Sequence, residues 1–508
     1  MRANVSEAID RTRLATTALN TEWLKIHLPP YLRRENEELA PLDEVAILHV
    51  GDSKKRVTIL YEIVRAANSL RQLYVGYVVP PTALHDEHQA VLKKIRVQPA
   101  WGAAAALAPE ANLILSAFPN ERKMALLTAT ELQAWMQENA AKFFFNGKKT
   151  RRQISLGPLE ETVMEVLRYV PGKRFTARCE ILVKPENGSV VMPQPRMGSA
   201  DILSAPPQRG ATSPPVTEAL RSAIRLAFIA KQVNDAGKAK QSYRALRALE
   251  KIWPNDGESA AAKVRFPRAL ALYDSAAVVF IEALPGKNLE QALAEIDIAQ
   301  VLPKVGALLA SFHAAPKRVR KRVTRKNELE EVREASAAIA SAFPEFKTPL
   351  QASLKTLRAW RWQDETPPAL LHGTFRLNHI FIHDGQLALL DLDSLRNGHP
   401  AYDLANFLSA LYYFETQGRL KTVQRRELAR HFLAGYAQAS PRAVAPATVL
   451  WFLSSLLINK QASKYVTHHQ QHSAEKVKQI LAIAGQILSQ QHHLPEDLAL
   501  SNLWQMLP

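Results

Sequence analysis

The feature that most constrains the fold is a change in hydrophobic pattern near residue 285. Before it, short runs of β-branched and apolar residues, bounded by Gly, Pro and polar residues, indicate strands. After it, apolar residues recur every three or four positions, which indicates amphipathic helices. We therefore expect an α+β chain in which a strand-rich part precedes a helical part.

The first 150 residues mix the two patterns. Residues 45–50, 56–64 and 70–79 are rich in β-branched and apolar side chains and are predicted to be strands. Residues 128–143 are predicted to form a helix, with Thr128 or Thr130 as N-cap and Glu131 as the capping-box partner. This region is expected to be an α/β unit, and its role is open.

A second strand-rich unit is predicted from residue 160 to 285. Strands at 161–170 and 175–183 flank a tight Pro-Gly turn, and further strands are expected at 225–233 and 276–284. The spacing of Tyr243, Leu246, Leu249 and Trp253 predicts a helix between them. Residues 184–216 contain seven prolines and are expected to be a flexible insertion.

Residues 286–508 are predicted to be mainly helical. An apolar stripe runs along residues 301–312, and residues 449–458 read as a buried helix. One strand pair interrupts the helices at about 379–393, where Asp384 and Gly385 are a strong hairpin signal.

A weak internal similarity links the first two parts. Residues 55–64 share Lys, Arg, Thr, Glu and Ile with residues 173–182, and residues 71–79 parallel 225–233. A duplicated strand unit explains this similarity, and so does chance resemblance between amphipathic strands.

Composition excludes several classes of protein. The chain has 508 residues, of which 47% are hydrophobic and 22% charged, so it is neither collagen-like nor wholly disordered and is long enough for more than one domain. Cys179 is the one cysteine, so no disulfide within the chain is possible. Without an apolar leader or an apolar run of membrane-spanning length, we expect a cytoplasmic protein with no membrane span.

The net charge of +17 favours contact with anions. The densest basic stretch begins at Lys317 and ends at Lys326, with seven basic residues and no acidic one. A solvated loop and a contact with a polyanion or partner both fit this stretch.

Two features of the sequence point to chemistry. Asp391 and Asp393 end a predicted strand beside a polar loop, and paired carboxylates suit a hard cation such as magnesium, although a hairpin with charged ends has the same pattern. Lys231 ends an apolar strand, where a lysine pairs nucleotide phosphates in phosphoryl transfer. A lysine that reaches water from a strand end is the alternative.

The chain from about residue 161 to its end resembles the aminoglycoside phosphotransferase and choline-kinase-like branch of the protein-kinase-like fold. The resemblance is carried by the motifs RYVPGKR, FIAK, FIEALPGKNL, LLASFHAAP, HGTFRLNHIF and LLDLDSLRNGHPAYDLANFL in this order. It implies a bilobal fold with an N-lobe at 160–285, a helical C-lobe at 286–508, and residues 1–150 as an additional region.

The resemblance also implies a set of site residues. The turn around Gly172 would cover a bound ATP, Lys231 would hold its phosphates, and Glu250 would orient that lysine. Glu282 lies in the segment 280–284, whose backbone would bind adenine. Asp391 would bind Mg²⁺ or Mn²⁺.

Three further residues of these motifs are expected to have supporting roles. His313 is expected to be structural, His372 to orient the catalytic loop, and Asp403 to cap or tie down a helix. None of the three is expected to take part in the chemistry.

The catalytic loop departs from the family pattern. Thr374 is the candidate catalytic residue at the position where the family has an aspartate as base, and loss of a positioned base costs about 10²–10⁴ in rate. His379 is the candidate second metal ligand, because it stands where the family has an amide in that role, although imidazole suits transition metals better than magnesium. Asp393 is the candidate for a surrogate base or metal ligand.

Two functions therefore remain open. One is an ATP-dependent phosphotransferase that acts on a small molecule bearing a hydroxyl or amine. The other is a catalytically impaired pseudokinase that binds nucleotide as a regulator or scaffold.

Overall fold

The computed structural model describes most of the chain. The described residues are 14–34, 40–53, 56–66, 70–121, 124–145, 154–185, 224–253, 264–316, 319–360, 366–467, 473–490, 493–495 and 497–508. Most of the predicted Pro-rich insertion, residues 186–216, lies outside them.

The first sheet has five antiparallel strands in the order β1-β2-β3-β5-β4. It includes the three strands predicted in this region. Its strands are β1 Leu42–Ser53, β2 Arg56–Arg65, β3 Leu70–Val78, β4 Ala105–Ala108 and β5 Leu113–Ala117. The helices of this region are α2 Thr21–His27, α3 Pro29–Leu32, α4 Leu84–Leu92 and α5 Ala129–Phe145. The predicted capping box of α5 forms, because Glu131 N donates to Thr128 Oγ1 at 3.2 Å and Thr128 N donates to Glu131 at 3.0 Å.

The second sheet follows the order β10-β11-β9-β8-β6, and β7 also pairs with β8. Its strands are β6 Ile154–Leu156, β7 Val163–Val170, β8 Arg174–Pro185, β9 Ile224–Val233, β10 Ala269–Tyr273 and β11 Val278–Glu282. Helix α6, Ala236–Ile252, lies between β9 and β10 in the chain and packs on this sheet. The strand β10 was not predicted from the sequence.

The two sheets share one topology. Strands β1, β2, β3, β5 and β4 pair in the same antiparallel order as β7, β8, β9, β11 and β10, and in each set of five a helix follows the third strand along the chain; β6 has no counterpart in the first sheet. The sequence similarity noted above pairs β2 with β8 and β3 with β9, the same strands that correspond in this order. Shared topology together with matching sequence favours duplication over chance.

The two sheets also share a core. Tyr77 and Val75 of the first sheet lie in one hydrophobic cluster with Phe175 and Phe280 of the second. Helix α5 seals this cluster, because Trp135 lies 4.8 Å from the Phe280 ring. The predicted domain boundary near residue 150 stays a prediction.

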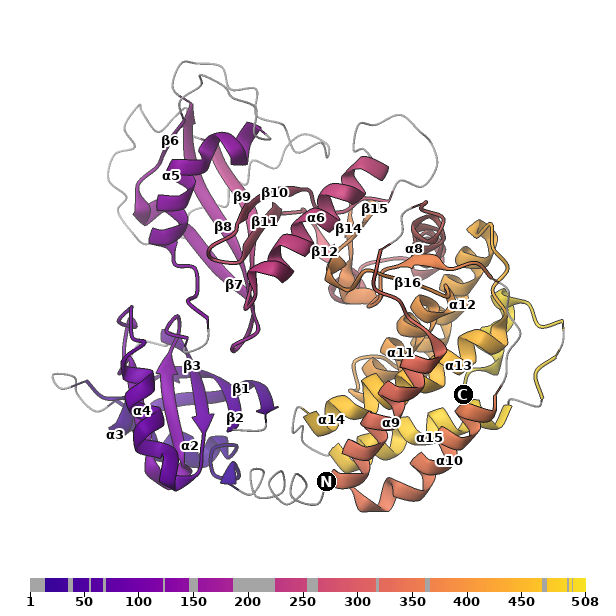
Figure 1. The fold of residues 1–508 in the computed structure, drawn as a ribbon, viewed down its shortest axis with the longest axis horizontal. Helices are drawn as coiled ribbons and strands as arrows, with labels where there is room; N and C mark the ends of the chain where they lie inside the picture. Colours follow the sequence, from indigo (N-terminus) through magenta and orange to yellow (C-terminus); the bar gives the residue numbers. More distant parts are fainter. Residues whose placement is uncertain are drawn as a thin grey trace.

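The chain after the second sheet is mainly helical, as predicted (Figure 1). Its helices are α7 Leu289–Ala292, α8 Ile298–His313, α9 Arg325–Ala342, α10 Lys347–Ala359, α11 Ala401–Thr416, α12 Thr422–Ala439, α13 Pro446–Leu456, α14 Ser463–Thr467 and α15 Ser473–Ser489. A π-helical turn, Leu457–Ala462, joins α13 to α14. The predicted stripe of α8 is buried in the main core of this lobe.

Short strands between these helices carry the loops that concern the site. They are β12 Lys287–Asn288, β13 Ala369–Leu371, β14 Ile380–His383, β15 Gln386–Leu389 and β16 Arg396–Gly398. Strands β14 and β15 form the predicted hairpin, and Asp384 and Gly385 both have positive φ, as its tight turn requires.

Two expectations from composition can be compared with the structure. Within the described residues, no helix is long and apolar enough to cross a membrane. Cys179 lies buried in β8, and burial raises the pKa of its thiol to about 12.

Candidate functional site

Lys231 lies near the end of the central strand β9, between Thr176 of β8 and Val279 of β11. Its side chain is 15% exposed. Its Nζ lies 3.0 Å from Asp391 Oδ1 and 2.5 Å from Asp393 Oδ2. Two segments 160 residues apart in the sequence therefore bring one ammonium and two carboxylates together.

The two aspartates follow β15, the second strand of the hairpin. Asp391 has φ +57°, a left-handed conformation that costs energy for a residue with a side chain and is often found at functional sites. Burial would raise the pKa of Asp391, but the charges of Lys231 and Arg174 outweigh it and hold that pKa well below its usual range. The carboxylate is therefore ionised.

Two more side chains complete this charged cluster. Arg174, the first residue of β8, lies 3.8 Å from Asp391 and 4.0 Å from Asp393. Ser242 of α6 donates to Asp393 Oδ1 at 2.9 Å. Two cations thus face two carboxylates, so the cluster is close to charge balance.

Asp403 fixes the loop that contains Thr374. Its fully buried carboxylate accepts the backbone N–H groups of His372 at 2.7 Å and Gly373 at 2.8 Å, and contacts His313 Nε2 at 3.2 Å. Asp403 therefore fixes the loop, whereas the sequence predicted that it would cap or tie down a helix. His313, buried beside it, holds Asp403 and Tyr436 in place.

His372 joins this loop to the segment of the aspartates. Its Nε2 donates to Leu390 O at 2.8 Å, one residue before Asp391. Burial lowers the pKa of His372, which keeps the ring neutral with its proton on Nε2. The expected orienting role agrees with this contact.

His379 is held by two neighbours in the same loop. Its Nδ1 donates to Thr374 O at 2.9 Å, and its Nε2 accepts from the Arg376 guanidinium at 2.9 and 3.1 Å. Burial and the Arg376 charge lower the pKa of His379 to about 2. The ring is neutral, with its single lone pair already used.

A metal ligand needs that lone pair, so the structure does not support His379 as a ligand. Its Nε2 lies 3.5 Å from Asp391 Oδ2, but Arg376 stands in the same direction. The carboxylates of Asp391 and Asp393 do fit a hard divalent cation that also binds phosphate oxygens. In the described part of the chain, no three His, Cys, Asp or Glu side chains gather as metal ligands.

Thr374, the candidate catalytic residue, is half-buried in this loop. Its hydroxyl lies 3.5 Å from the Nδ1 atoms of His372 and His379, at the outer limit of a hydrogen bond. Both oxygens of the Asp393 carboxylate already have partners, Lys231 and Ser242, which belong to the charged cluster and not to the loop of Thr374. The loop itself contains no carboxylate.

Gly172 lies in the turn between β7 and β8, with φ +67°. Its N–H donates to Glu121 at 2.7 Å, and its carbonyl accepts from Asn234 at 2.9 Å. The turn directly precedes Arg174, so it lies beside the cluster around Lys231.

Glu250 was expected to orient Lys231, and the structure contradicts this. One of its oxygens accepts Ala269 N at 2.6 Å and the other pairs with Arg247 at 2.8 Å. Glu250 lies near the far end of α6, where it fixes the start of β10. Asp391 and Asp393 pair with Lys231 instead.

Glu282 ends β11 in the predicted hinge segment. Its carboxylate accepts from Arg268 N at 3.2 Å and lies 3.6 Å from Arg265. Its own backbone N–H donates to Arg268 O at 2.9 Å. The side chain thus stiffens the segment, and backbone contact with adenine stays a prediction.

Two half-buried lysines lie behind the loop. Lys460, in the π-helical turn, donates to Gly373 O at 3.3 Å and Asn406 Oδ1 at 2.8 Å, and burial lowers its pKa to about 8. Lys464 stacks 4.2 Å from the Tyr413 ring, and burial lowers its pKa to about 7. π-helical turns are frequent at functional sites.

Sequence reasoning missed four residues of the site. Arg174 stood within a quoted motif, as the first residue after the turn, and its position was a usable signal. Arg376 stood two residues from Thr374. Ser242 and Lys460 had no signal, because their position depends on how α6 and the π-helical turn pack.

The basic stretch that ends at Lys326 is partly built into the fold. Val323 N donates to Asn397 O at 2.8 Å, and Arg325 donates to backbone carbonyls at the end of α10. Burial lowers the pKa of Lys321. The first two residues of the stretch lie outside the described residues, and contact with a polyanion stays a prediction.

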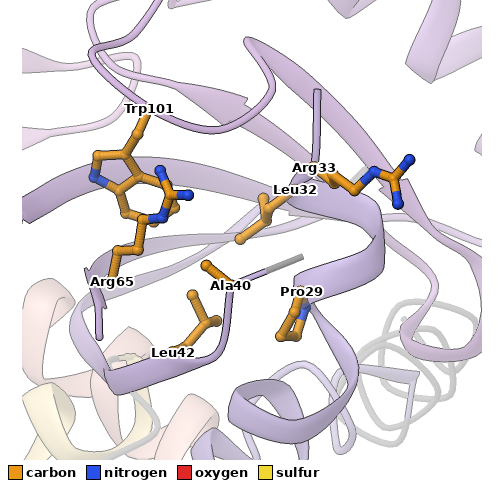
Figure 2. Close-up of a pocket in the computed structure, with 7 residues that line it drawn as sticks. All are labelled: Pro29, Leu32, Arg33, Ala40, Leu42, Arg65 and Trp101. Carbon is orange, nitrogen blue, oxygen red and sulfur yellow. The ribbon is translucent and has the colours of Figure 1, made fainter. Parts of the chain in front are cut away.

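A small pocket lies on the first sheet, away from this cluster (Figure 2). It has room for about one water molecule. It is lined by Pro29, Leu32, Arg33, Ala40, Leu42, Arg65 and Trp101. None of the candidate site residues contributes to it.

Comparison with known proteins identifies the middle of the chain. Residues 212–447 match the model of the phosphotransferase enzyme family. No curated protein sequence matches the chain.

Several solved structures are similar. Aminoglycoside phosphotransferase APH(2'')-Ib with ADP shares 13% identity, covers 70% of this chain and 98% of its own, and has a TM-score of 0.39. A thermostable mutant of aminoglycoside phosphotransferase APH(4)-Ia with AMP-PNP and hygromycin B shares 12% sequence identity. The match covers 71% of this chain and 98% of its own, with a TM-score of 0.43. A choline/ethanolamine kinase family protein from Mesorhizobium loti shares 11% sequence identity. The match covers 55% of this chain and 86% of its own, with a TM-score of 0.36.

The family match confirms the resemblance inferred from the sequence. The fold is α+β, with a strand-rich part that precedes a mainly helical part and an additional N-terminal sheet, as predicted.

Proposed function

We propose that this protein, in which residues 212–447 match the model of the phosphotransferase enzyme family, transfers phosphate from ATP to a small molecule bearing a hydroxyl or amine. The observation that carries the proposal is the convergence of Lys231 with Asp391 and Asp393. An ammonium and two carboxylates are the groups that hold a nucleotide triphosphate and its metal ion.

Each group has a proposed part. Lys231 and Arg174 bind the phosphates, and Asp391 and Asp393 hold Mg²⁺ or Mn²⁺. When bound, the metal ion neutralises charge on the phosphates. The segment that contains Glu282 binds adenine through its backbone, and Gly172 lies in the turn above the phosphates.

Thr374 lies where the acceptor hydroxyl would approach, and it cannot act as a base near neutral pH. Phosphoryl transfer depends mainly on positioning and charge stabilisation, so transfer is expected to be slow and not absent. His379 links Arg376 to Thr374, because it accepts a hydrogen bond from Arg376 and donates one to Thr374 O. Arg376 therefore adds positive charge near the proposed path of the transferred phosphoryl group.

The test is metal-dependent ATP consumption with a panel of sugars, amino alcohols and aminoglycosides. Product formation that is lost in Asp391→Asn supports the proposal. The companion variant Thr374→Asp restores a carboxylate and is expected to raise the rate by about 10² or more. If neither the wild type nor Thr374→Asp forms a phosphorylated product, the proposed phosphate transfer is contradicted.

A second function is favoured by one observation, the absence of a carboxylate from the loop at Thr374. In that case the protein binds nucleotide as a regulator. It would then show thermal stabilisation by MgATP without turnover, and measurable phosphate transfer would exclude this function.

A further inference from the structure

A segment made up of Glu121 and residues 124–127 lies between the first sheet and α5 in the chain and contacts the candidate nucleotide site twice. Glu121, at its start, contacts the turn above the site. Residues 125 and 127, at its end, contact the strand that carries Lys231. The two contacts lie on separate elements, so they constrain the site from two directions.

The first contact is made by a buried carboxylate. Glu121 is 5% exposed and accepts from Tyr169 OH at 2.6 Å and from Gly172 N at 2.7 Å. Tyr77 OH of the first sheet donates to its other oxygen at 3.2 Å. Charge-assisted hydrogen bonds of this length are stronger than neutral ones, so the turn is firmly held.

This contact accounts for the backbone donors of the turn. Pro171 has no N–H, the Gly172 N–H is bound to Glu121, and Lys173 N donates to Val170 O at 3.0 Å. Glycine-rich loops cradle phosphates with such N–H groups. Here none of the three residues offers one, so phosphates must be held by the nearby side chains of Lys231 and Arg174.

The second contact uses the residue after Lys231. Side chains alternate along a strand, so Lys231 faces the charged cluster while Gln232 faces the opposite side of the second sheet. Gln232 is 2% exposed, accepts from Leu127 N at 2.9 Å and donates to Ala125 O at 2.8 Å. The strand that positions Lys231 is therefore bound to the same segment.

We propose that the segment made up of Glu121 and residues 124–127 is a positioning element of the nucleotide site, with Glu121 as the positioning residue of the Gly172 turn. The proposal rests on the proposed function, since it gives the N-terminal region a part in holding nucleotide. Displacement of a binding group by about 1 Å costs up to about 10² in rate. The position of the turn, which contains a single glycine, is therefore important for the site.

The experiment compares Glu121→Ala with Glu110→Ala. Glu110 lies in the same region and accepts from Tyr31, but it is exposed and does not touch the turn. Two quantities are measured: hydrogen exchange of peptides that cover residues 169–174, and the Kd for MgADP. We expect exchange and Kd each to rise about tenfold in Glu121→Ala and to stay unchanged in Glu110→Ala.

A second pair separates positioning from general stability. Tyr77→Phe removes a donor from the same carboxylate but leaves its bond to Gly172, so exchange at 169–174 and Kd are expected to stay near wild type. Glu121→Gln keeps an acceptor oxygen and is expected to restore part of the MgADP affinity. Equal loss of affinity in Tyr77→Phe and Glu121→Ala would overturn the proposal.

The outcomes also separate this inference from the proposed function. A wild-type protein that binds no MgADP contradicts the proposed function, and the exchange data still decide whether Glu121 holds the turn. Unchanged exchange at residues 169–174 in Glu121→Ala overturns the positioning proposal, even where MgADP binds.

Discussion

At the scale of single residues, the site depends on charges that are paired before any ligand binds. Lys231 contacts both aspartates, and Arg174 lies within 4.0 Å of each. Desolvation makes an unpaired charge expensive in such a place, so the removal of one partner is felt by the others.

The sequence contained the signals for Lys231, Asp391 and Asp393, because each ends a predicted strand where a charged side chain is unusual. Glu250 was mispredicted, since the acidic residue in a helix says nothing of the direction in which that helix faces. His379 was misjudged for a related reason, because Arg376 takes its lone pair and this requires the folded loop.

Lys464 gives a prediction that depends on pH. Burial lowers its pKa from 10.5 to about 7, so between these values the unfolded chain binds more protons than the folded one. Stability from this group therefore rises with pH between about 7 and 10.5 and is constant below that window.

In Lys464→Met this dependence is removed. We expect the Tm of the variant to exceed that of the wild type by about 2 °C at pH 7, and the difference to shrink as pH rises toward 10. Differential scanning calorimetry across this range measures it. A difference that grows with pH would contradict the assignment.

At the scale of elements, Asp403 is the main link between α11 and the loop at Thr374. Its two oxygens accept the N–H groups of His372 and Gly373. Asp403→Asn replaces one acceptor by a donor, so one buried N–H loses its partner.

We expect Asp403→Asn to lower the free energy of unfolding by about 3 kcal/mol, as measured by urea denaturation. Asp384→Asn is the matched control, because that side chain is 85% exposed in a turn that asparagine also favours. Equal stability of the two variants would contradict a stabilising contact between Asp403 and the backbone of His372 and Gly373.

Helices α8 and α12 cross closely through glycine. A Cβ on Gly306 of α8 would lie 2.3 Å from Phe432 O and 2.4 Å from Tyr436 N, both backbone atoms of α12. Gly485 of α15 meets no atom within 4 Å at the same position.

The two glycines predict opposite effects on stability. Gly306→Ala is expected to lower the free energy of unfolding by about 1–3 kcal/mol through overpacking. Gly485→Ala is expected to raise it by about 0.5–1 kcal/mol through helix propensity. Chemical denaturation of both variants measures the pair, and a stabilising Gly306→Ala would refute the close crossing.

At the scale of the whole molecule, the order of strand-rich and helical parts was predictable because each period of the hydrophobic pattern is local. The hairpin at Asp384 and the helix at Thr128 were predictable because turn and cap residues carry their own signals. The strands β13 and β16 were not, because each has three residues and gains its stability from pairing across the lobe.

The packing of the first sheet on the second was also beyond sequence reasoning. Tyr77 and Phe175 share one core although 98 positions separate them, and the contact between Glu121 and Gly172 depends on that packing. The similarity between residues 55–64 and 173–182 was visible, but the shared strand order was needed to favour duplication.

The most direct test of the account is calorimetric titration of ADP with Mg²⁺ into wild type and Lys231→Ala. Lys240→Ala is the control, because the side chain of that lysine on α6 is 45% exposed and pairs with Asp274. We predict that Kd rises at least about tenfold, or about 1.4 kcal/mol, in Lys231→Ala and stays within about twofold in Lys240→Ala. Equal MgADP affinity of wild type and Lys231→Ala would contradict a nucleotide site built on Lys231, Asp391 and Asp393.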